Sequence, residues 1–515
     1  MQVKDFLTSP SYTATVSIAR RGLPFMKVCM PHAAPIAQCT DPAAVRFDAA
    51  LLRKLSRAGP RYTSYPTADR FHGGFGYGDY LGAVAARRSR GAVQPLSLYL
   101  HIPFCDTVCY YCACNKIVTR RTDKAARYLA YLKREIAMQG ALFTGMHQLR
   151  QLHLGGGTPT YLSDAQIDEL MAVLRHHFAF ASDAEGEYAI EVDPRTVTPQ
   201  RIARLRQQGF NRLSLGVQDF DEAVQRAVNR VQPEAQTLAI IAAARAHGYR
   251  SVNIDLIYGL PEQNLATMAD TLERVVRADP DRIALYHYAH LPQLFKPQRR
   301  IDTARLPDGE TKLAMLGMAI ERLGRAGYVY IGMDHFAKPG DELAVAQRQG
   351  RLHRNFQGYS THADADIVAC GVSAIGAVGT TYSQNAKTLD AYYAAIDEQR
   401  LPIERGVALS MDDVLRRTII QMLMCQFELS IAAIEQAFPI VFADYFKAEL
   451  AALDQLAGDA LVVLEDGWIS VTERGRLLIR NVCMVFDAYL GQPVGKPAEQ
   501  GVPVPGAPTR FSATV

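Results

Sequence analysis

The chain has 515 residues, of which 49% are hydrophobic and 21% are charged, close to the averages of globular proteins. These values exclude wholesale disorder, and the length corresponds to about three average domains, or fewer if one of them is an α/β barrel. The 56 basic and 52 acidic residues are too evenly balanced for a protein that binds nucleic acid through its charge. No run approaches the roughly 18 apolar residues of a membrane span, so none is expected.

The first 45 residues differ in composition from the rest of the chain. Four basic side chains outnumber two acidic ones there, and Pro24, Pro31 and Pro35 prevent a continuous helix. A basic, acid-poor leader is typical of a transit peptide. An unstructured extension, or a start codon placed too early, would look the same, because Met26 and Met30 follow. We expect a flexible N-terminal extension over residues 1–45.

From about residue 46 onward, strand-like and helix-like segments alternate. Strands are predicted at residues 96–101, 151–154, 188–192, 212–216, 251–257, 282–288 and 328–331. Helices are predicted at residues 164–177, 198–208, 265–278 and 310–326, with two short ones ending near residue 247. Ser163 and Thr198 are predicted helix caps.

This alternation predicts an α/β fold with right-handed βαβ units and a parallel sheet. The six strands between residues 96 and 288 are too few for a closed eight-stranded barrel, so we expect an open or partial (βα)6 barrel. Ligands of such sheets bind at the carboxyl ends of the strands. The chemically informative residues are therefore expected just after each strand.

After residue 400 the pattern becomes mostly helical. Helices are predicted at residues 411–424, 431–438, 443–457 and 473–489, with two strands at 461–464 and 468–471 around a turn. This order is typical of a winged-helix-like domain. The helix at 443–457 is acidic, whereas a DNA-recognition helix is basic, so we expect a lid or packing role. The predicted domains are a flexible extension (1–45), an N-terminal segment or substrate lid (46–95), the partial barrel and its extension (96–400), the helical C-terminal domain (401–490) and a loose tail (491–515).

Four of the nine cysteines lie within ten residues, at positions 105, 109, 112 and 114. A disulfide framework needs small size and spaced partners, so this pattern indicates a reducing compartment, and we expect a cytoplasmic protein. Cys105, Cys109 and Cys112 follow the first strand in a loop, where three thiolates can converge. Thiolates select zinc or iron–sulfur clusters.

The spacing of these three cysteines argues for a cluster with one open iron. A structural zinc site usually joins two distant ligand pairs, and the sequence has no second pair. A complete ferredoxin set supplies four cysteines to each cubane. Three ligands would leave one iron free to bind and activate a small molecule. Cys114 can instead be a neighbouring free thiol, and the lone Cys370, Cys425 and Cys483 are expected to be small core residues.

Further candidates follow other strands. The glycines at 155–157 let the backbone approach a ligand closely, although an ordinary turn would also use them. Glu191 and Asp255 stand near strand ends, where a carboxylate can accept ribose hydroxyls or balance a sulfonium charge; either could instead cap the next helix. Tyr111, between two cysteines, could be a packing residue. The sequence has neither a GxGxxG motif nor a P-loop.

These motifs resemble those of a known family. The three cysteines after the first strand are similar to those of the radical S-adenosylmethionine (SAM) superfamily. The wider sequence resembles the oxygen-independent coproporphyrinogen III oxidases over roughly residues 55 to 490. The matching segments lie at residues 60–66, 99–105, 112–119, 155–160, 191–194, 216–219, 255–261 and 353–358. The cysteines alone would indicate only the superfamily, whereas the whole set is specific to this family.

The resemblance implies an α/β partial (βα)6 radical-SAM barrel with a mostly helical, winged-helix-like C-terminal domain. It implies a [4Fe-4S] cluster on Cys105, Cys109 and Cys112, with SAM on the fourth iron, and a second SAM molecule beside it. For the first SAM it implies Tyr99, Gly156, Glu191 and Ile375. For the second SAM it implies Tyr111, Gly157, Thr158, Gln218, Arg230, Asp255 and Ala289. Family members also carry the fourth cysteine without using it as a ligand.

The implied reaction is oxidative decarboxylation of two propionates of coproporphyrinogen III to vinyl groups, giving protoporphyrinogen IX without oxygen. The substrate carries four propionates, so cationic anchors are expected, with Arg61 and Arg300 chosen from a set that also holds Lys296, Arg299 and Arg354. The implied partners are an electron donor such as a flavodoxin or ferredoxin system, and the protein is expected to be a monomer. The alternatives are a haem-binding chaperone of the same superfamily and a thiolate-rich structural or electron-transfer module.

Overall fold

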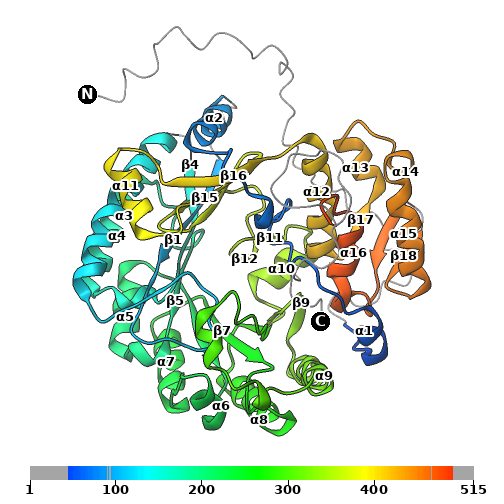
Figure 1. Cartoon of the computed structure of the whole chain (residues 1–515), viewed down its shortest axis with the longest axis horizontal. Coiled ribbons are helices and arrows are strands. Elements are labelled where there is room, and N and C mark those ends of the chain that lie inside the picture. The colour runs from blue at the N-terminus through cyan, green and yellow to red at the C-terminus, as the bar shows by residue number, and fades with distance from the viewer. Residues whose placement is uncertain (1–44, 90, 92–93, 146, 466, 491–515) are drawn as a thin grey trace.

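The computed structural model describes residues 45–89, 91, 94–145, 147–465 and 467–490. The predicted extension, except for its last residue, and the predicted tail lie outside these residues. A twelve-stranded sheet runs in the order β16-β15-β14-β13-β1-β4-β5-β6-β7-β8-β10-β9. Figure 1 shows the helices of its parallel part forming an outer arc around the strands, with the C-terminal helices on the other side.

The centre of the sheet confirms the predicted parallel βα units. Its six predicted strands are β1 (Gln94–Ile102), β4 (His147–Gly156), β5 (Glu187–Val192), β6 (Arg212–Gln218), β7 (Ser251–Tyr258) and β8 (Arg282–His287). Each pairs in parallel with the next. The helices between them are α3 (Thr122–Phe143), α4 (Asp164–His177), α5 (Pro199–Gln208), α6 (Glu222–Ala227), α7 (Glu234–Ala246) and α8 (Leu265–Ala278). No element was predicted over the residues of α3.

The sheet extends beyond the predicted strands on both sides. β13 (Asp366–Cys370) pairs in parallel with β1, and it is followed by the antiparallel strands β14 (Ile375–Val378), β15 (Thr381–Asn385) and β16 (Ile403–Ala408). At the other edge β10 (His335–Ala337) and β9 (Val329–Gly332) are antiparallel. α9 (Gly309–Arg325) precedes β9. Within the described chain, the edge strands β16 and β9 share no ladder, so the barrel is open.

Local capping explains where the barrel helices begin. The side chain of Ser163 accepts a hydrogen bond from the main-chain N–H of Gln166 at the start of α4, and Thr198 caps α5 in the same way. Both caps were predicted. Asn264 caps α8. The alternative that Glu191 or Asp255 caps the following helix is therefore wrong.

The register of the parallel strands gives the barrel a polar inner face. Tyr99 pairs with His153, and Glu191 pairs with Ser214. Side chains paired across a parallel ladder point to the same face, and so do residues two apart on one strand. The intervening residues of β5 to β7 are buried. Asp255, paired with Gly216, follows the same alternation.

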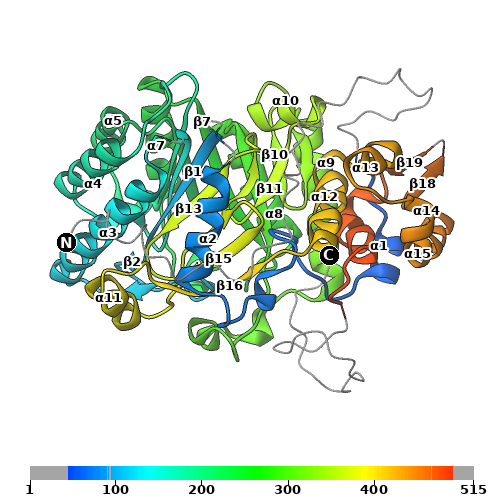
Figure 2. The same cartoon turned by 90° about the horizontal axis from the view of Figure 1, so that it is seen from above.

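The C-terminal region has the predicted winged-helix-like order, with shorter helices at its end. It comprises α12 (Met411–Gln426), β17 (Glu428–Ser430), α13 (Ile431–Ala437), α14 (Phe442–Tyr445), α15 (Lys447–Gly458), β18 (Val462–Glu465), β19 (Trp468–Val471) and α16 (Ile479–Val485). The predicted helix at 443–457 is divided into α14 and α15, and the last helix is shorter than predicted. Figure 2 shows these elements gathered at one end of the molecule, opposite α3 and α4.

The N-terminal segment lies against this C-terminal domain. α1 (Ala49–Leu55) lies near α16 in both views (Figures 1 and 2). The main-chain N–H of Arg46 donates to the carbonyl of Glu473 (3.0 Å), and the Tyr62 hydroxyl donates to Asp487 (2.9 Å). α2 (Tyr77–Arg88) packs on β14 and β15 instead. A substrate-lid role for residues 46–95 stays a prediction.

None of the helices in the described ranges combines the length and the apolar character that crossing a bilayer requires.

Candidate active site

The cysteine loop is held at the carboxyl end of β1 by short backbone ladders. β2 (Phe104–Cys105) pairs in parallel with β3 (Ile117–Val118), and the Thr119 N–H donates to the Cys105 carbonyl (3.0 Å). Between these anchors the Cys112 N–H donates to the Cys109 carbonyl (3.2 Å), which closes a turn. Cys109 is buried, Cys105 and Cys112 are half-buried, and Cys114 is exposed. The loop thus holds three cysteines of differing exposure within a short, backbone-anchored segment.

The sulfur atoms of two cysteines receive hydrogen bonds from outside the loop. The Thr158 hydroxyl donates to the Cys105 sulfur (3.5 Å). Arg230 Nη1 and Arg195 Nη2 donate to the Cys109 sulfur, at 3.4 and 3.7 Å. Asp193 accepts from both guanidinium groups, at 3.0 Å from Arg230 and 2.7 Å from Arg195. Cationic donors favour a thiolate, the form that ligates iron.

The cysteines differ in acidity. Burial raises the pKa of Cys105 to about 11, although the Thr158 hydrogen bond opposes the rise. A hydrogen bond between Cys112 and Cys114 lowers the pKa of Cys112 to about 5, against the effect of burial. Cys114 therefore supports a neighbouring thiolate in this structure. Its exclusion from the cluster stays a prediction.

The donor set fits an iron–sulfur cluster better than a single ion. Among the described residues, no three His, Cys, Asp or Glu side chains converge as the ligands of one metal ion would. A cubane places each cysteine on a different iron, so its three thiolates need not converge on one point. The half-buried loop and the hydrogen bonds to sulfur are features that tune such clusters.

The glycine turn brings the end of β4 against the cysteine loop. Gly156 has φ 116°, and a Cβ there would lie 2.6 Å from the His101 ring. A Cβ on Gly157 would lie 2.7 Å from the Phe104 carbonyl oxygen. The Gly157 N–H donates to the Ile102 carbonyl (2.8 Å). Gly156 and Gly157 are therefore required because neighbouring atoms leave no room for a Cβ, and not only because the chain turns here.

Glu191 is oriented toward this turn. It accepts hydrogen bonds from His153 Nε2 (3.1 Å) and from the Gly156 N–H (3.2 Å). Burial alone would raise the pKa of Glu191, but the hydrogen bond and charge of His153 hold it below its usual value. The Tyr99 ring stacks on His153 with centroids 5.8 Å apart, and its hydroxyl lies 3.1 Å from His101 Nδ1.

Asp255 lies on the same inner face, two strands away. Its carboxylate accepts from the Ser214 hydroxyl (3.0 Å) and from Asn253 Nδ2 (2.9 Å). Burial, together with the charge of Glu191, raises the pKa of Asp255 to about 6. Two partly exposed carboxylates on one face of the sheet are a favourable place for hydroxyl or cationic groups of a ligand.

Gln298 joins two other predicted positions. Its Nε2 donates to the main-chain carbonyls of Tyr111 (3.0 Å) and Ala289 (3.2 Å).

Gln218 ends β6 with φ 70°. Burial raises the pKa of Tyr111, which borders an apolar cluster around Val224. The position of Tyr111 is thus compatible both with a packing role and with the predicted contact to a ligand.

The remaining predicted residues lie in three places. Ile375 begins β14, beside the strand that pairs with β1. Arg61 forms an ion pair with Asp334. Arg300 is exposed, with its guanidinium carbon 5.4 Å from the centroid of the Tyr110 ring. The structure therefore does not bring Arg300 into contact with Arg61, and the substrate role of each stays a prediction. The expected core positions of Cys370, Cys425 and Cys483 are confirmed.

Sequence reasoning missed several polar residues of the site. His101, His153 and Asp193 contact predicted residues, as does Arg195. His101 stands two residues after Tyr99 on β1, and His153 stands two residues before Gly155 on β4. Residues two apart on a strand point to the same face, so this spacing could have indicated both histidines. Nothing in the sequence indicated that Arg195 would reach Cys109.

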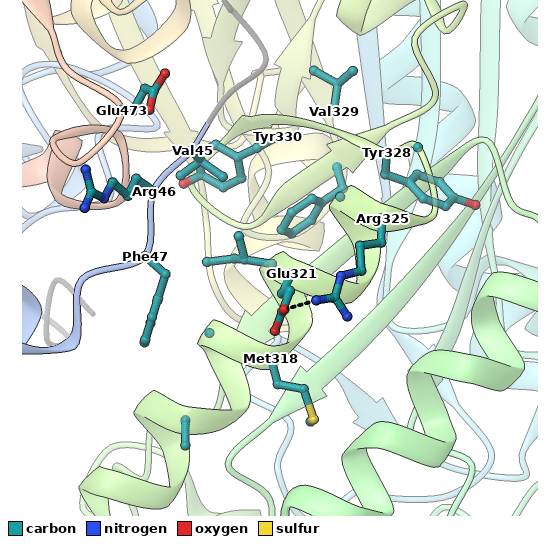
Figure 3. A pocket seen from close by; sticks show the side chains of 16 residues that line it. Val45, Arg46, Phe47, Met318, Glu321, Arg325, Tyr328, Val329, Tyr330 and Glu473 are labelled. Atoms are coloured by element: carbon teal, nitrogen blue, oxygen red, sulfur yellow. Dashed lines mark hydrogen bonds and ion pairs between the residues drawn. The ribbon is translucent and has the colours of Figure 1, made fainter. Parts of the chain in front are cut away.

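A surface pocket lies elsewhere, along α9 (Figure 3). It is lined by residues 45–47, by one side of α9, by residues 327–330 and by Phe336 and Glu473. The charged pair Glu321 and Arg325 lies within it. None of the predicted site residues lines it, so it is not the candidate active site.

Glu135 of α3 supports the loop that leads to Ile375. Its buried carboxylate accepts hydrogen bonds from the Gly371 N–H (2.7 Å), Asn385 Nδ2 (2.7 Å) and the Tyr392 hydroxyl (2.6 Å). Burial raises the pKa of Glu135 to about 7, and these three donors oppose the rise. The network ties α3 to the strands beyond β13.

Replacing Tyr392 by phenylalanine is expected to lower the free energy of unfolding by about 1–3 kcal/mol, because a buried acceptor loses a donor. The loss should grow between pH 7 and 8. Without this donor the pKa of Glu135 rises further, so the folded variant holds more protons in that range than the native fold does. Urea unfolding at pH 6 and pH 8 measures both effects. Tyr393→Phe is the matched control, since its hydroxyl donates to none of the described residues; an equal loss in both variants would contradict the role of Glu135.

Comparisons with known proteins agree with this geometry. The model of the radical SAM superfamily matches residues 99–275, and that of the HemN C-terminal domain matches residues 409–478. The oxygen-independent coproporphyrinogen III oxidase of Escherichia coli (strain K12) is 52% identical over 448 residues, covering 87% of this chain and 96% of that protein. The enzyme of the same name from Pseudomonas aeruginosa is 50% identical over 446 residues, with the same coverage.

A solved structure gives the same result for the fold. The structure described as coproporphyrinogen III oxidase (HemN) from Escherichia coli, a radical SAM enzyme, superimposes with a TM-score of 0.83 at 51% identity. It covers 87% of this chain and 100% of that one. These relatives favour the oxidase over the haem chaperone and over an electron-transfer module. The chain belongs to the oxygen-independent coproporphyrinogen III oxidase family of radical SAM enzymes.

Proposed function

We propose that this chain converts two propionate side chains of coproporphyrinogen III to vinyl groups, giving protoporphyrinogen IX without oxygen. The observation that carries the proposal is the similarity to named oxidases at 52% identity over nearly their whole length. The three-cysteine loop after β1 supports it, together with Glu191 and Asp255 on the inner face of the sheet. In each decarboxylation the substrate loses a β-hydrogen atom, carbon dioxide and one electron, which passes to an acceptor.

Cys105, Cys109 and Cys112 would hold three irons of a [4Fe-4S] cluster and leave the fourth to SAM. When bound and reduced, cluster and SAM supply the 5′-deoxyadenosyl radical that takes the β-hydrogen. Arg195 and Arg230 hold negative charge at the Cys109 sulfur through their hydrogen bonds.

Two SAM positions are part of the proposal. The first would be held by Tyr99, Gly156, Glu191 and Ile375. The second would be held by Tyr111, Gly157, Thr158, Gln218, Arg230, Asp255 and Ala289. The shared inner face of β1 to β7 supports the assignment of Tyr99, Glu191 and Asp255. We also propose a cytoplasmic monomer that receives electrons from a flavodoxin or ferredoxin system.

Anaerobic reconstitution tests the function directly. The protein with iron, sulfide, SAM and a reductant should cleave SAM faster when coproporphyrinogen III is added, and protoporphyrinogen IX should accumulate with release of carbon dioxide. A protein that cleaves SAM, releases no carbon dioxide and binds haem stoichiometrically would be a haem carrier instead. Such a carrier would need an axial ligand for the haem iron.

Arg61→Ala is expected to raise the KM for coproporphyrinogen III by about 10-fold or more, because a charged hydrogen bond to a propionate is lost. Iron content and SAM cleavage without substrate should not change. Initial rates over a range of porphyrinogen concentrations measure the effect. Arg351→Ala is the control, since Arg351 is exposed and its side chain donates, among the described residues, to Gln349 alone. If Arg61→Ala and Arg351→Ala had the same KM for coproporphyrinogen III, Arg61 would not be a substrate-binding residue.

A further inference from the structure

Arg354 is a buried cation that no carboxylate of the described residues balances. It lies in β11 (His353–Asn355) and is 3% exposed. Its Nη1 atom is buried and has no hydrogen-bond partner among those residues. Arg212 and Arg230, by contrast, each form an ion pair with a carboxylate. A buried charge without a counter-ion is costly, so the partner of Arg354 is expected to come from outside the chain.

The guanidinium of Arg354 is not needed to hold its own strand. β11 pairs with β12 (Gly358–Ser360) as an antiparallel hairpin. Gln421 of α12 binds both main-chain groups of Arg354, accepting from its N–H (3.1 Å) and donating to its carbonyl (2.8 Å). The backbone is thus fixed independently of the side chain. A purely structural role would leave Nη1 unexplained.

A second cation stands beside it. Arg354 Nε lies 3.4 Å from the main-chain carbonyl oxygen of Arg61, to which it donates. The Arg61 side chain is 35% exposed and is paired with Asp334. Arg480 of α16 donates to the carbonyls of Gly59 and Pro60, which fixes the approach of this segment. Asp334 is thus the carboxylate that pairs with Arg61, and among the described residues none pairs with Arg354.

Aromatic rings connect this pair to the inner face of the barrel. The guanidinium carbon of Arg354 lies 4.8 Å from the centroid of the Tyr359 ring, and that of Arg61 lies 6.0 Å from the Tyr286 ring. The His335 ring contacts both tyrosines, with centroids 5.3 Å from Tyr359 and 6.0 Å from Tyr286. Tyr286 pairs across the ladder with Ile257, two residues after Asp255. The cations thus adjoin the face that carries the predicted SAM residues.

We propose that Arg354 and Arg61 bind one carboxylate of the substrate, with Arg354 Nη1 as a donor and the rings of Tyr286, His335 and Tyr359 as the wall beside it. This inference rests on the proposed function, in which that carboxylate is a propionate of coproporphyrinogen III. A guanidinium suits the role because its planar donors match a carboxylate. Aromatic rings offer apolar contact to the tetrapyrrole next to that charge.

Arg354→Met tests the proposal in the reconstituted holoenzyme. We expect a KM for coproporphyrinogen III raised by about 10- to 100-fold, as for the loss of a charged hydrogen bond. Iron content and SAM cleavage without porphyrinogen should match the unmodified protein. Arg354→Lys keeps the positive charge but loses the planar, two-pronged donor geometry of the guanidinium. Its KM should therefore lie between that of the unmodified protein and that of Arg354→Met. Arg351→Met, in the exposed loop before β11, is the matched control.

A binding measurement separates carboxylate recognition from turnover. Fluorescence titration with coproporphyrin III, which has the same four carboxylates, should show the same loss of affinity in Arg354→Met. Its tetramethyl ester, which has no carboxylate, should bind both proteins alike. Equal weakening for acid and ester would indicate a general packing defect and overturn the proposal.

The outcomes distinguish this inference from the proposed function. If the unmodified protein releases carbon dioxide and Arg354→Met has the KM of Arg351→Met, the inference is wrong and the function stands. If the fully reconstituted protein releases no carbon dioxide, the proposed function is wrong. The fluorescence titration alone then tests whether Arg354 binds a carboxylate. If Arg354→Met does not fold, Arg354→Lys decides: a KM and an affinity equal to those of the unmodified protein would overturn the proposal.

Discussion

Cys109→Ser is expected to remove the [4Fe-4S] cluster and with it all SAM cleavage. Serine oxygen is a poor ligand for iron in such clusters, where thiolates are selected. Cys109 is also the buried member of the loop, and two guanidinium groups donate to its sulfur. Replacing it leaves Arg195 and Arg230 facing a group that cannot take the negative charge. Iron and sulfide content, with the visible absorption of the cluster, measure the loss.

Cys114→Ser is the matched control for this change. Cys114 is exposed and lies two residues beyond Cys112, so we expect iron content close to that of the unmodified protein. The change removes the thiol that lowers the pKa of Cys112, so reconstitution should be slower at neutral pH, while the final content should not fall. If Cys114→Ser lost iron as completely as Cys109→Ser, the model of three ligands and one open iron would be wrong.

The parallel part of the fold could be predicted because each strand there is followed by a helix with a clear start. α4 and α8 have their predicted bounds, and the caps Ser163 and Thr198 are local signals. β13, β14 and β15 follow one another without such helices, and each has five residues or fewer, while α11 (Leu389–Asp397) lies between β15 and β16. The place of β13 in the sheet depends on its pairing with β1, which lies over 260 residues earlier, and no local pattern shows it.

The active site divides in the same way. Its cysteines follow the first strand, and its glycines and carboxylates stand at or near the ends of other strands, so sequence spacing was enough to select them. The contacts that support them come from distant positions. Arg230 reaches Cys109 across 121 residues, and Glu135 reaches Asn385 across 250. Such pairs depend on how helices and loops pack, which the sequence pattern does not specify.

The contact between Arg230 and Cys109 changes how the two predicted SAM sites should be separated. Arg230 donates to a cluster cysteine and to Asp193, so its replacement would disturb the cluster as well as a second SAM. Asp255 contacts Ser214 and Asn253 and none of the cysteines. Asp255 is therefore the cleaner probe of the second site, and Glu191 remains the probe of the first.

Glu191→Gln should weaken SAM at the cluster by about 10- to 100-fold, since a carboxylate that receives or balances charge is lost. Asp255→Asn should leave that SAM in place and slow turnover. With labelled SAM, the holoenzyme should retain two molecules per chain, and Asp255→Asn should retain one. The electron paramagnetic resonance change that SAM causes in the reduced cluster should persist in Asp255→Asn and be lost in Glu191→Gln.

The acidity of Asp255 adds a second test of this separation. Burial and the charge of Glu191 raise its pKa to about 6, and a carboxylate accepts ligand hydroxyls best when ionised. Turnover should therefore fall as the pH drops below about 6, where Asp255 takes up a proton. Asp255→Asn should lack this fall and be slow at every pH, whereas a control such as Tyr393→Phe should keep it. A single SAM per chain in the unmodified holoenzyme, or loss of the cluster signal in both variants, would contradict two separate sites.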